Sequence, residues 1–286
     1  MQKPNGRAST PALTPCSFCP SRNKAACQGI EPQDRSGLAA LEAARSATRV
    51  YEAGDIICAQ GDPSDYIFNL ISGWVETHRD MADGRRQIVA FLQPGAIFGV
   101  DLPGEELSQT ATAITKTVVC PIKTSKFEEL RRSFPAFNEQ YVSLLLQENR
   151  NLVRTLTRVS QGSAKERIGG LLWSLALNAV GEDVFKLGVV IPMPLTQRHI
   201  AEATGLTSIH VNRVLRQLRE EQILELRDGK LIAVNAKKLR AIAEPGADWT
   251  TSAPPRPAPV RESSSNHAAA PTPWLRRSGP GAAGCG

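Results

Sequence analysis

Residues 194–220, PLTQRHIAEATGLTSIHVNRVLRQLRE, constrain the fold most, because they carry the pattern of two short amphipathic helices joined by a tight turn. Thr196 and Thr207 are good N-cap residues for the two helices, and Gly205 supplies the permissive backbone that the turn requires. The inward stripe of the second helix repeats at helical spacing and consists of Val211, Val214, Leu215 and Leu218. The stretch predicts a helix-turn-helix.

The outward face of the second helix is basic and carries an amide, which suits a DNA major groove. The residues expected to contact DNA are Ser208, Ile209, Asn212, Arg213 and Arg216. Residues 223–234 alternate into a strand pair around Asp228-Gly229, a strong hairpin signal. An ordinary basic surface helix is the alternative, and the hairpin that follows argues against it. We predict a winged helix that binds DNA.

The length, charge and hydropathy of the chain limit the classes of protein to which it can belong. A chain of 286 residues suits two domains with tails, and its formal charge of +6 favours a polyanionic partner. It has no run of 18 apolar residues, so we expect no membrane span. The first residues, MQKPNGRASTPALTP, lack the apolar core of a secretory signal. We therefore expect a cytoplasmic protein whose six cysteines do not form structural disulfides.

Three of the cysteines lie close together near the N-terminus. Cys16, Cys19 and Cys27 are separated by two and seven residues. Three thiolates from one loop could converge on a metal centre, and an iron–sulfur cluster would then need a fourth ligand from elsewhere. A zinc site would accept Cys or His as that ligand, and free thiols in a loose N-terminus are the third interpretation. The local spacing alone leaves all three open.

The segment from 49 to 123 has many short strand patterns with turn signals every 8–12 residues or so, which predicts an antiparallel β-roll. A short Ala/Leu-rich helix is expected before it, at 38–47. Cys58 falls in a predicted strand and is interpreted as a small buried residue. Glycines stand where turns are needed, at positions 54, 61, 73, 84, 95 and 99.

A long helix is expected after the β-roll, because Pro135 permits a new helix start and the pattern continues to residue 160. One stripe along it steps by three and four residues, the spacing of a seam between paired helices. The stripe consists of Val142, Leu145, Asn149, Leu152, Leu156 and Val159. Packing on the chain's own β-roll is the alternative. In a seam, polar Asn149 would weaken pairing while fixing its register.

At this point three stretches together resemble the CRP/FNR family of bacterial transcription regulators. They are the pattern GD-x-I-x-x-Q-GD at 54–62, the stretch SGWVETHRD…GRRQIVAFLQPGAIFG, and the turn PLTQRHIAEATGLT. The resemblance covers roughly residues 16–244 and implies an α+β fold. Its implied parts are a cysteine-bearing segment (1–30), a cyclic-nucleotide-binding-like antiparallel β-roll (31–134), a dimerisation helix (135–160), a C-terminal winged helix-turn-helix (161–244) and a disordered tail (245–286).

The cysteines resemble the oxygen-sensing FNR branch of this family, in which four cysteines hold a [4Fe–4S] cluster. The resemblance implies that Cys16, Cys19, Cys27 and Cys120 hold such a cluster. It also implies a homodimer that binds a palindromic operator in double-stranded DNA and contacts RNA polymerase, with dimerisation under control of the cluster. The same fold sensing through thiol oxidation or zinc, or binding DNA constitutively, remains the alternative.

The departures from the family's patterns also carry information. The positions that hold ribose and phosphate in the cyclic-nucleotide branch are Val100, after Gly99, and Gln109-Thr110 here, so cyclic AMP is not expected as a ligand. Ile209 and Asn212 replace the Glu and Ser usual in the oxygen-sensing branch, so the half-site should differ. His78 is the only histidine in the β-roll, too few for a cupin-like metalloenzyme, and we expect no enzymatic activity.

Overall fold

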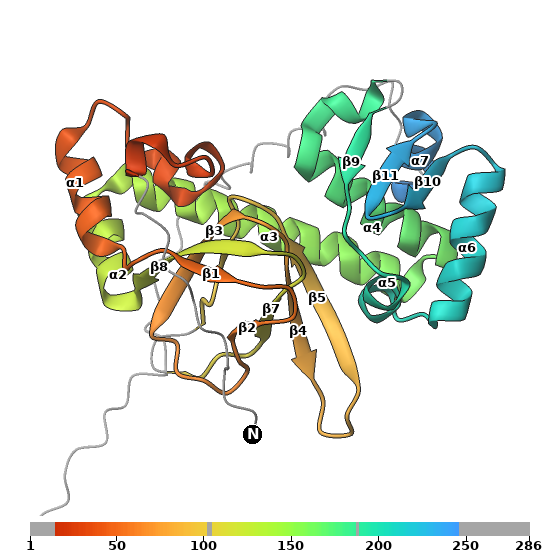
Figure 1. The fold of residues 1–286 in the computed structure, drawn as a ribbon, viewed down its shortest axis with the longest axis horizontal. Coiled ribbons are helices and arrows are strands. Elements are labelled where there is room, and N and C mark those ends of the chain that lie inside the picture. Colours follow the sequence, from red (N-terminus) through yellow and green to blue (C-terminus); the bar gives the residue numbers. More distant parts are fainter. Residues whose placement is uncertain (1–14, 102–104, 187–188, 246–286) are drawn as a thin grey trace, which may run out of the picture. The chain divides into compact units, whose positions relative to one another are not determined.

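The computed structural model describes residues 15–101, 105–186 and 189–245 (Figure 1). The predicted tail lies outside these ranges from residue 246 onward. The described chain begins with three short 3-10 helices, η1 (Cys16–Phe18), η2 (Arg22–Lys24) and η3 (Ala26–Gly29), followed by helix α1 (Arg35–Ala44). Helix α1 starts three residues before the predicted position, because Asp34 caps it by accepting a 2.9 Å hydrogen bond from the Gly37 backbone N–H.

The β-roll is present where the sequence predicts it. Its strands are β1 (Arg49–Tyr51), β2 (Ile56–Cys58), β3 (Tyr66–Ser72), β4 (Val75–Asp80), β5 (Arg86–Leu92), β6 (Ile97–Phe98), β7 (Thr110–Ala113) and β8 (Thr117–Lys123). They form two antiparallel sheets with the orders β1-β8-β3-β6 and β2-β7-β4-β5. Leu70, Val75 and Val119 are completely buried in the core of the roll.

The six glycines predicted to form turns in this region all have positive φ, between 75° and 101°. Such a backbone costs little for glycine and is strained for other residues. At Gly73 and Gly99 a Cβ atom would also collide with neighbouring atoms, so both positions require glycine for two reasons. The turn chemistry that sets the strand boundaries is thus encoded locally.

Two helices follow the roll, α2 (Thr124–Ser133) and α3 (Pro135–Gln161), and Pro135 is the first residue of α3 as predicted. The N-terminal part of α3 is anchored by Phe137 and Tyr141, which are buried against Phe127 of α2 with ring centroids 5.3 Å and 5.0 Å apart. Among the described residues, no helix has the combination of length and apolarity that crossing a bilayer requires.

The C-terminal part contains a helix-turn-helix and a small sheet. Its elements are α4 (Ala164–Val180), η4 (Gly181–Phe185), β9 (Val190–Pro192), α5 (Gln197–Thr204), α6 (Ser208–Glu220), β10 (Leu224–Arg227), β11 (Lys230–Ala233) and α7 (Ala236–Ala243). The predicted hairpin is the β10–β11 pair, and β9 adds a third strand that the sequence pattern did not reveal. The predicted α+β fold of β-roll, long helix and winged helix-turn-helix is confirmed.

Candidate functional site

The helix-turn-helix is held by the caps that the sequence predicts. Thr196 Oγ1 accepts a 3.1 Å hydrogen bond from the His199 backbone N–H at the start of α5, and the Thr196 N–H donates to His199 Nδ1 at 3.2 Å. Thr207 caps α6 through a 3.2 Å bond from the His210 N–H. Gly205 between the helices has φ 67°, the left-handed conformation that ends α5.

Helix α6 has one buried and one exposed face. Val211, Val214 and Leu218 are buried and Leu215 is partly buried, close to the predicted stripe. All five predicted DNA-contacting residues are exposed: Ser208, Ile209 (86 % exposed), Asn212, Arg213 and Arg216. An exposed helix face of this kind, with an amide and two guanidinium groups, matches the donors and acceptors on base edges in a major groove.

The hairpin beside α6 forms the wing. Asp228 and Gly229 both have positive φ, 52° and 69°, as a two-residue hairpin turn with the correct twist requires. Arg227 and Lys230 flank this turn and are exposed. Arg227 lies 3.6 Å from a Glu225 oxygen and 3.5 Å from an Asp228 oxygen, so part of its charge is balanced within the wing. The Lys230 ammonium beside the turn could contact a phosphate group.

The four predicted ligand cysteines come from three segments that the fold brings together. Cys16 opens η1, Cys19 ends it, Cys27 lies in η3, and Cys120 lies in β8 opposite Asn69 of β3. Burial, together with the nearby sulfurs of Cys120, Cys16 and Cys19, raises the pKa of the Cys27 thiol to about 12. Burial likewise raises the pKa of Cys120 to about 12, with additional effects of Cys16 and Cys19. The four thiols thus lie within electrostatic range of one another.

This donor set fits an iron–sulfur cluster in kind and in number, since the four thiols influence one another and Cys16, Cys27 and Cys120 pack against the same buried apolar cluster. The raised pKa values of Cys16, Cys27 and Cys120 mean that these three thiols are protonated at neutral pH, and metal binding would release their protons. Within the described ranges, no group of three or more His, Cys, Asp or Glu side chains has an arrangement ready to hold a metal ion. The four sulfurs thus lie in one region of the structure but are not arranged as the ligands of a metal centre.

The cysteine segment is ordered and tied down, although its sequence suggests only a loop. Arg22 is 5 % exposed and donates hydrogen bonds to the backbone oxygens of Ile30 and Cys16. Gly29 packs so closely against the backbone of Ala136 in α3 that a Cβ atom would overlap its carbonyl oxygen. The sequence shows an arginine among the cysteines. Only the folded structure shows that Arg22 holds the segment together by donating to two of its backbone oxygens.

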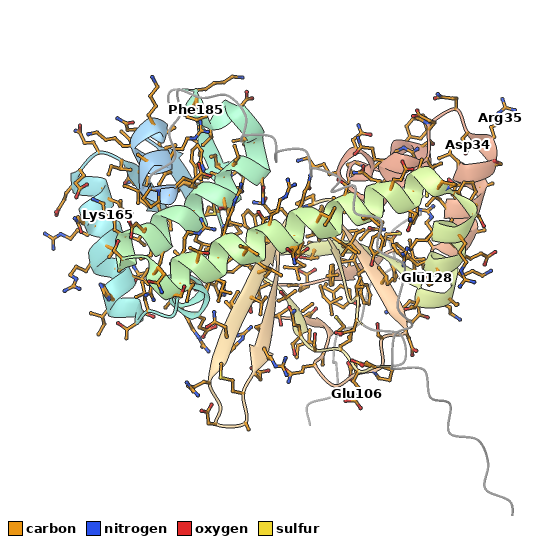
Figure 2. All side chains as sticks on the ribbon, turned by 180° about the vertical axis from the view of Figure 1, so that it is seen from behind. Asp34, Arg35, Glu106, Glu128, Lys165 and Phe185 are labelled. Atoms are coloured by element: carbon orange, nitrogen blue, oxygen red, sulfur yellow. The ribbon has the colours of Figure 1, made fainter. Side chains whose placement is uncertain are left out.

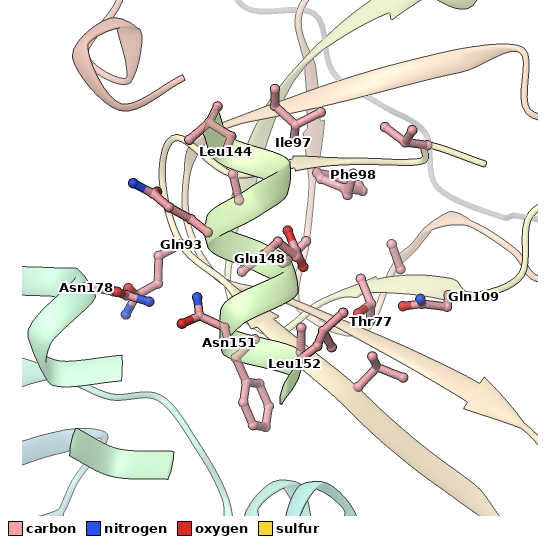
Figure 3. Close-up of a pocket in the computed structure, with 18 of the residues that line it drawn as sticks. Thr77, Gln93, Ile97, Phe98, Gln109, Leu144, Glu148, Asn151, Leu152 and Asn178 are labelled. Atoms are coloured by element: carbon pink, nitrogen blue, oxygen red, sulfur yellow. The ribbon is translucent and has the colours of Figure 1, made fainter. Parts of the chain in front are cut away.

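A cavity of about 540 Å³ lies between the β-roll, α3 and α4 (Figure 3). Val100 and Gln109, at the positions that hold ribose and phosphate in the cyclic-nucleotide branch, both line it. Glu148 of α3 and Asn178 of α4 line other parts of the wall. Sequence reasoning did not anticipate the contribution of α4, because it depends on how the C-terminal part packs against the roll.

The outer face of α3 is apolar and exposed. Figure 2 shows it running across the front of the view with no described helix or strand over it. Four predicted seam residues are at least 39 % exposed: Val142, Leu145, Leu152 and Leu156. Asn149 is exposed beside them, Val159 is partly buried, and the structure adds Leu146 and Val153, which the seam pattern omitted. A stripe of this size on one helix is typical of an interaction surface.

Two family descriptions match the chain. The cyclic nucleotide-binding domain matches residues 48–134, and the Crp-like helix-turn-helix domain matches residues 166–242. These ranges correspond to the β-roll with α2, and to the winged helix-turn-helix.

The chain is also similar to named proteins. It is 27 % identical over 239 residues to the transcriptional activator protein FnrL of Cereibacter sphaeroides, covering 82 % of this chain and 92 % of FnrL. It is 31 % identical over 184 residues to the nitrogen fixation regulation protein FixK of Rhizobium meliloti, covering 64 % of this chain and 81 % of FixK. The solved structure of FixK2 from Bradyrhizobium japonicum superposes with a TM-score of 0.61 at 25 % identity, covering 71 % of this chain and 99 % of FixK2.

The fold, the order of the two domains and the similar proteins all point to the same family. The family consists of transcription regulators rather than enzymes, as the shortage of histidines in the β-roll predicts. The chain therefore belongs to the CRP/FNR family and is a DNA-binding transcription regulator that uses its helix-turn-helix.

Proposed function

We propose that this regulator responds to oxygen or redox state through a [4Fe–4S] cluster held by Cys16, Cys19, Cys27 and Cys120. The cluster state would control dimerisation through α3 and thereby binding to a palindromic operator. The proposal is supported by the gathering of these four half-buried thiols, from segments about a hundred residues apart, within electrostatic range of one another. The similarity to FnrL and to the anaerobic regulatory protein of Pasteurella multocida agrees with it.

When bound, the cluster would supply an inorganic centre sensitive to oxygen, and the chain would transmit its state. Cys120 belongs to the β-roll, whereas the other three ligands belong to the N-terminal segment, so simultaneous ligation ties that segment to the roll. The segment also touches α3, through the contact of Gly29 with Ala136 and a 3.2 Å hydrogen bond from Gln140 Nε2 to Gln28 Oε1. Release of the segment would therefore disturb the N-terminal part of α3 directly.

The dimer would form through the exposed face of α3. Val142, Asn149 and Leu156 repeat every seven residues, with Leu145, Leu152 and Val159 between them, as in a two-helix seam. Asn149 would cost stability at a central position of the seam. A seam weakened in this way forms a dimer whose association responds to small changes in α3.

Leu156→Glu is expected to convert the anaerobic dimer to a monomer. Leu156 is 70 % exposed in the described chain, so the substitution costs the monomer little. In a dimer it would bury two facing carboxylates without partners, at a cost of about 3 kcal/mol or a hundredfold in the dissociation constant. Sedimentation velocity under anoxia measures the change. Arg154→Glu, exposed on the side of α3 away from the stripe, is the control and should remain dimeric; equal behaviour of the two variants would refute the stripe as the interface.

The cavity beside α3 supports the inference that cyclic AMP is not the ligand. Val100 offers no hydrogen bond to a ribose, and Gln109 carries no charge to neutralise a phosphate. Glu148 adds a carboxylate to the same cavity. The two positions at which the cyclic-nucleotide branch holds ribose and phosphate thus provide no positive charge here, although Lys24 and Arg158 line other parts of the cavity.

Purification under strict anoxia tests the cluster directly. We expect a brown protein with broad visible absorbance and about four iron and four sulfide per monomer, lost on exposure to air. Zinc in place of iron, or a colourless metal-free protein, would contradict the proposal and favour zinc or thiol sensing. Operator binding measured with and without oxygen completes the test, because equal affinity in the two conditions identifies a constitutive regulator.

A further inference from the structure

The β-roll and the helix-turn-helix meet at a junction that the functions above do not use. The β4–β5 ribbon lies beside α5 (Figure 1). Trp74, Ile88 and Phe91 of the roll belong to the same buried apolar cluster as Ile200 and Ala203 of α5. The helix-turn-helix is therefore packed on the roll and not merely connected to it through α3 and α4.

A group of ionisable side chains lies within this junction, and Arg86 of β5 is at its centre. Arg86 Nη2 donates hydrogen bonds to Glu76 Oε1 and, at 2.8 Å, to His78 Nδ1, both on neighbouring β4. Arg86 Nη1 lies 3.8 Å from Glu202 Oε2 on α5. One guanidinium group thus spans the ribbon and the first helix of the helix-turn-helix.

The buried charges make Arg86 necessary at this position. Glu76 is 3 % exposed, and a carboxylate with so little solvent requires a positive partner. The Glu202 side chain is 16 % exposed and lies between Arg86 on the roll side and Arg198, which donates to its Oε1 at 2.6 Å on the outer side. Burial lowers the pKa of His78 and of His199, so the imidazoles remain neutral at pH 7 and Arg86 supplies the inward-facing positive charge.

Three further contacts cross the junction. His199 Nε2 of α5 lies 3.8 Å from Glu76 Oε2 of β4. Gln87 Nε2 donates to the Ala203 carbonyl oxygen at 3.5 Å, and Gln93 Nε2 donates to the Leu175 carbonyl oxygen at 3.1 Å. With the helix-turn-helix docked in this way, the DNA-contacting face of α6 remains exposed, including Ile209 and Arg213. The docked arrangement therefore leaves the recognition helix free to enter a groove.

We propose that Arg86 is a positioning residue for DNA recognition, which holds α5 against the β4–β5 ribbon through Glu76 and Glu202 and so fixes the orientation of the recognition helix. In a dimer, both recognition helices must enter the groove at a set separation. A fixed orientation removes the cost of ordering each helix-turn-helix at the second contact. The inference rests on the proposed binding of a palindrome by a dimer.

The test compares a full palindrome with a single half-site. The palindrome is selected from a random duplex library with the wild-type protein, and the half-site duplex is made by scrambling one arm. Arg86→Met and Glu202→Gln are each expected to weaken palindrome binding about tenfold while half-site affinity changes less than about twofold. Arg85→Ala is the matched control, because Arg85 neighbours Arg86 but is exposed and paired only with Asp83 of its own turn in the described structure.

Glu202→Gln keeps the test decisive if Arg86→Met folds poorly, since it leaves the Arg86–Glu76 pair intact. The double variant should bind the palindrome no more weakly than the worse single variant, because both remove the same contact. Retained palindrome affinity in both single variants, or equal losses on palindrome and half-site, would overturn the positioning role. If the wild-type protein binds the palindrome and the half-site equally, it does not bind DNA as a dimer on two half-sites. That result would refute the proposed function and the positioning role of Arg86 together.

Discussion

Anaerobically purified Cys120→Ser is expected to contain less than about a tenth of the iron and sulfide of the wild-type protein and to lack its visible absorbance. Cys120 is the only one of the four proposed ligands that belongs to the β-roll. A serine hydroxyl is a harder and far less acidic donor than a thiol, so it does not replace a thiolate on iron. The remaining three cysteines come from one short segment and leave one iron without a protein ligand.

Cys58→Ser is the matched control for this experiment. Cys58 also lies in a strand of the roll, and burial raises the pKa of its thiol to about 12, as it does for Cys120. Cys58 is not among the groups that shift the pKa of Cys16, Cys27 or Cys120. Cys58→Ser should therefore retain full iron content. Iron retained in Cys120→Ser would show that the fourth ligand is another residue, and iron lost equally from both variants would show that the roll itself is damaged.

Arg213→Ala is expected to remove about 1–3 kcal/mol of discrimination between the operator and a scrambled duplex, a five- to 150-fold loss in the specificity ratio. Arg213 is exposed on the outward face of α6, where a guanidinium group could donate two hydrogen bonds to guanine O6 and N7. Binding to the scrambled duplex should largely persist, since it depends on contacts with phosphate groups. Fluorescence anisotropy at one fixed salt concentration measures both affinities.

Arg219→Ala provides the comparison on the same helix. Arg219 is exposed near the C-terminal end of α6, six residues after Arg213 and beyond all five residues expected to contact DNA. Its loss should weaken binding to both duplexes by a similar factor and leave their ratio unchanged. A specificity ratio that falls as far in Arg219→Ala as in Arg213→Ala would contradict the assignment of base reading to Arg213.

Much of the fold follows from local patterns, and the reason is that these patterns act within a few residues. The caps at Thr196 and Thr207, the turn at Gly205 and the hairpin at Asp228-Gly229 were predicted from the sequence and are present. A cap or a turn satisfies backbone groups of its immediate neighbours, so nothing distant is needed to specify it. The strands of the roll were predicted for the same reason.

The candidate sites could be predicted from the sequence to different degrees. Three cysteines of the proposed cluster are close in sequence, whereas Cys120 was linked to them only by family resemblance, because spacing carries no information across about a hundred residues. The apolar stripe on α3 was visible in the sequence, yet only the structure shows how much of it is exposed: Leu156 is 70 % exposed, whereas Leu145 and Leu152 also line the cavity beside the roll. The ligand, dimer and DNA assignments remain predictions.

The sequence by itself determined the main helices, the strand region of the roll, its turns and the helix-turn-helix with its hairpin, because short-range sterics and hydrogen bonds encode them. It did not reveal β9 or the 3-10 helices of the cysteine segment. Only the tertiary structure decided which side chains meet across the junction of roll and helix-turn-helix. Glu76 and His78 look like ordinary polar positions of a strand, and Glu202 is more than a hundred residues away on a helix. Their pairing with Arg86 depends on how two packed apolar surfaces dock, and no local pattern specifies that geometry.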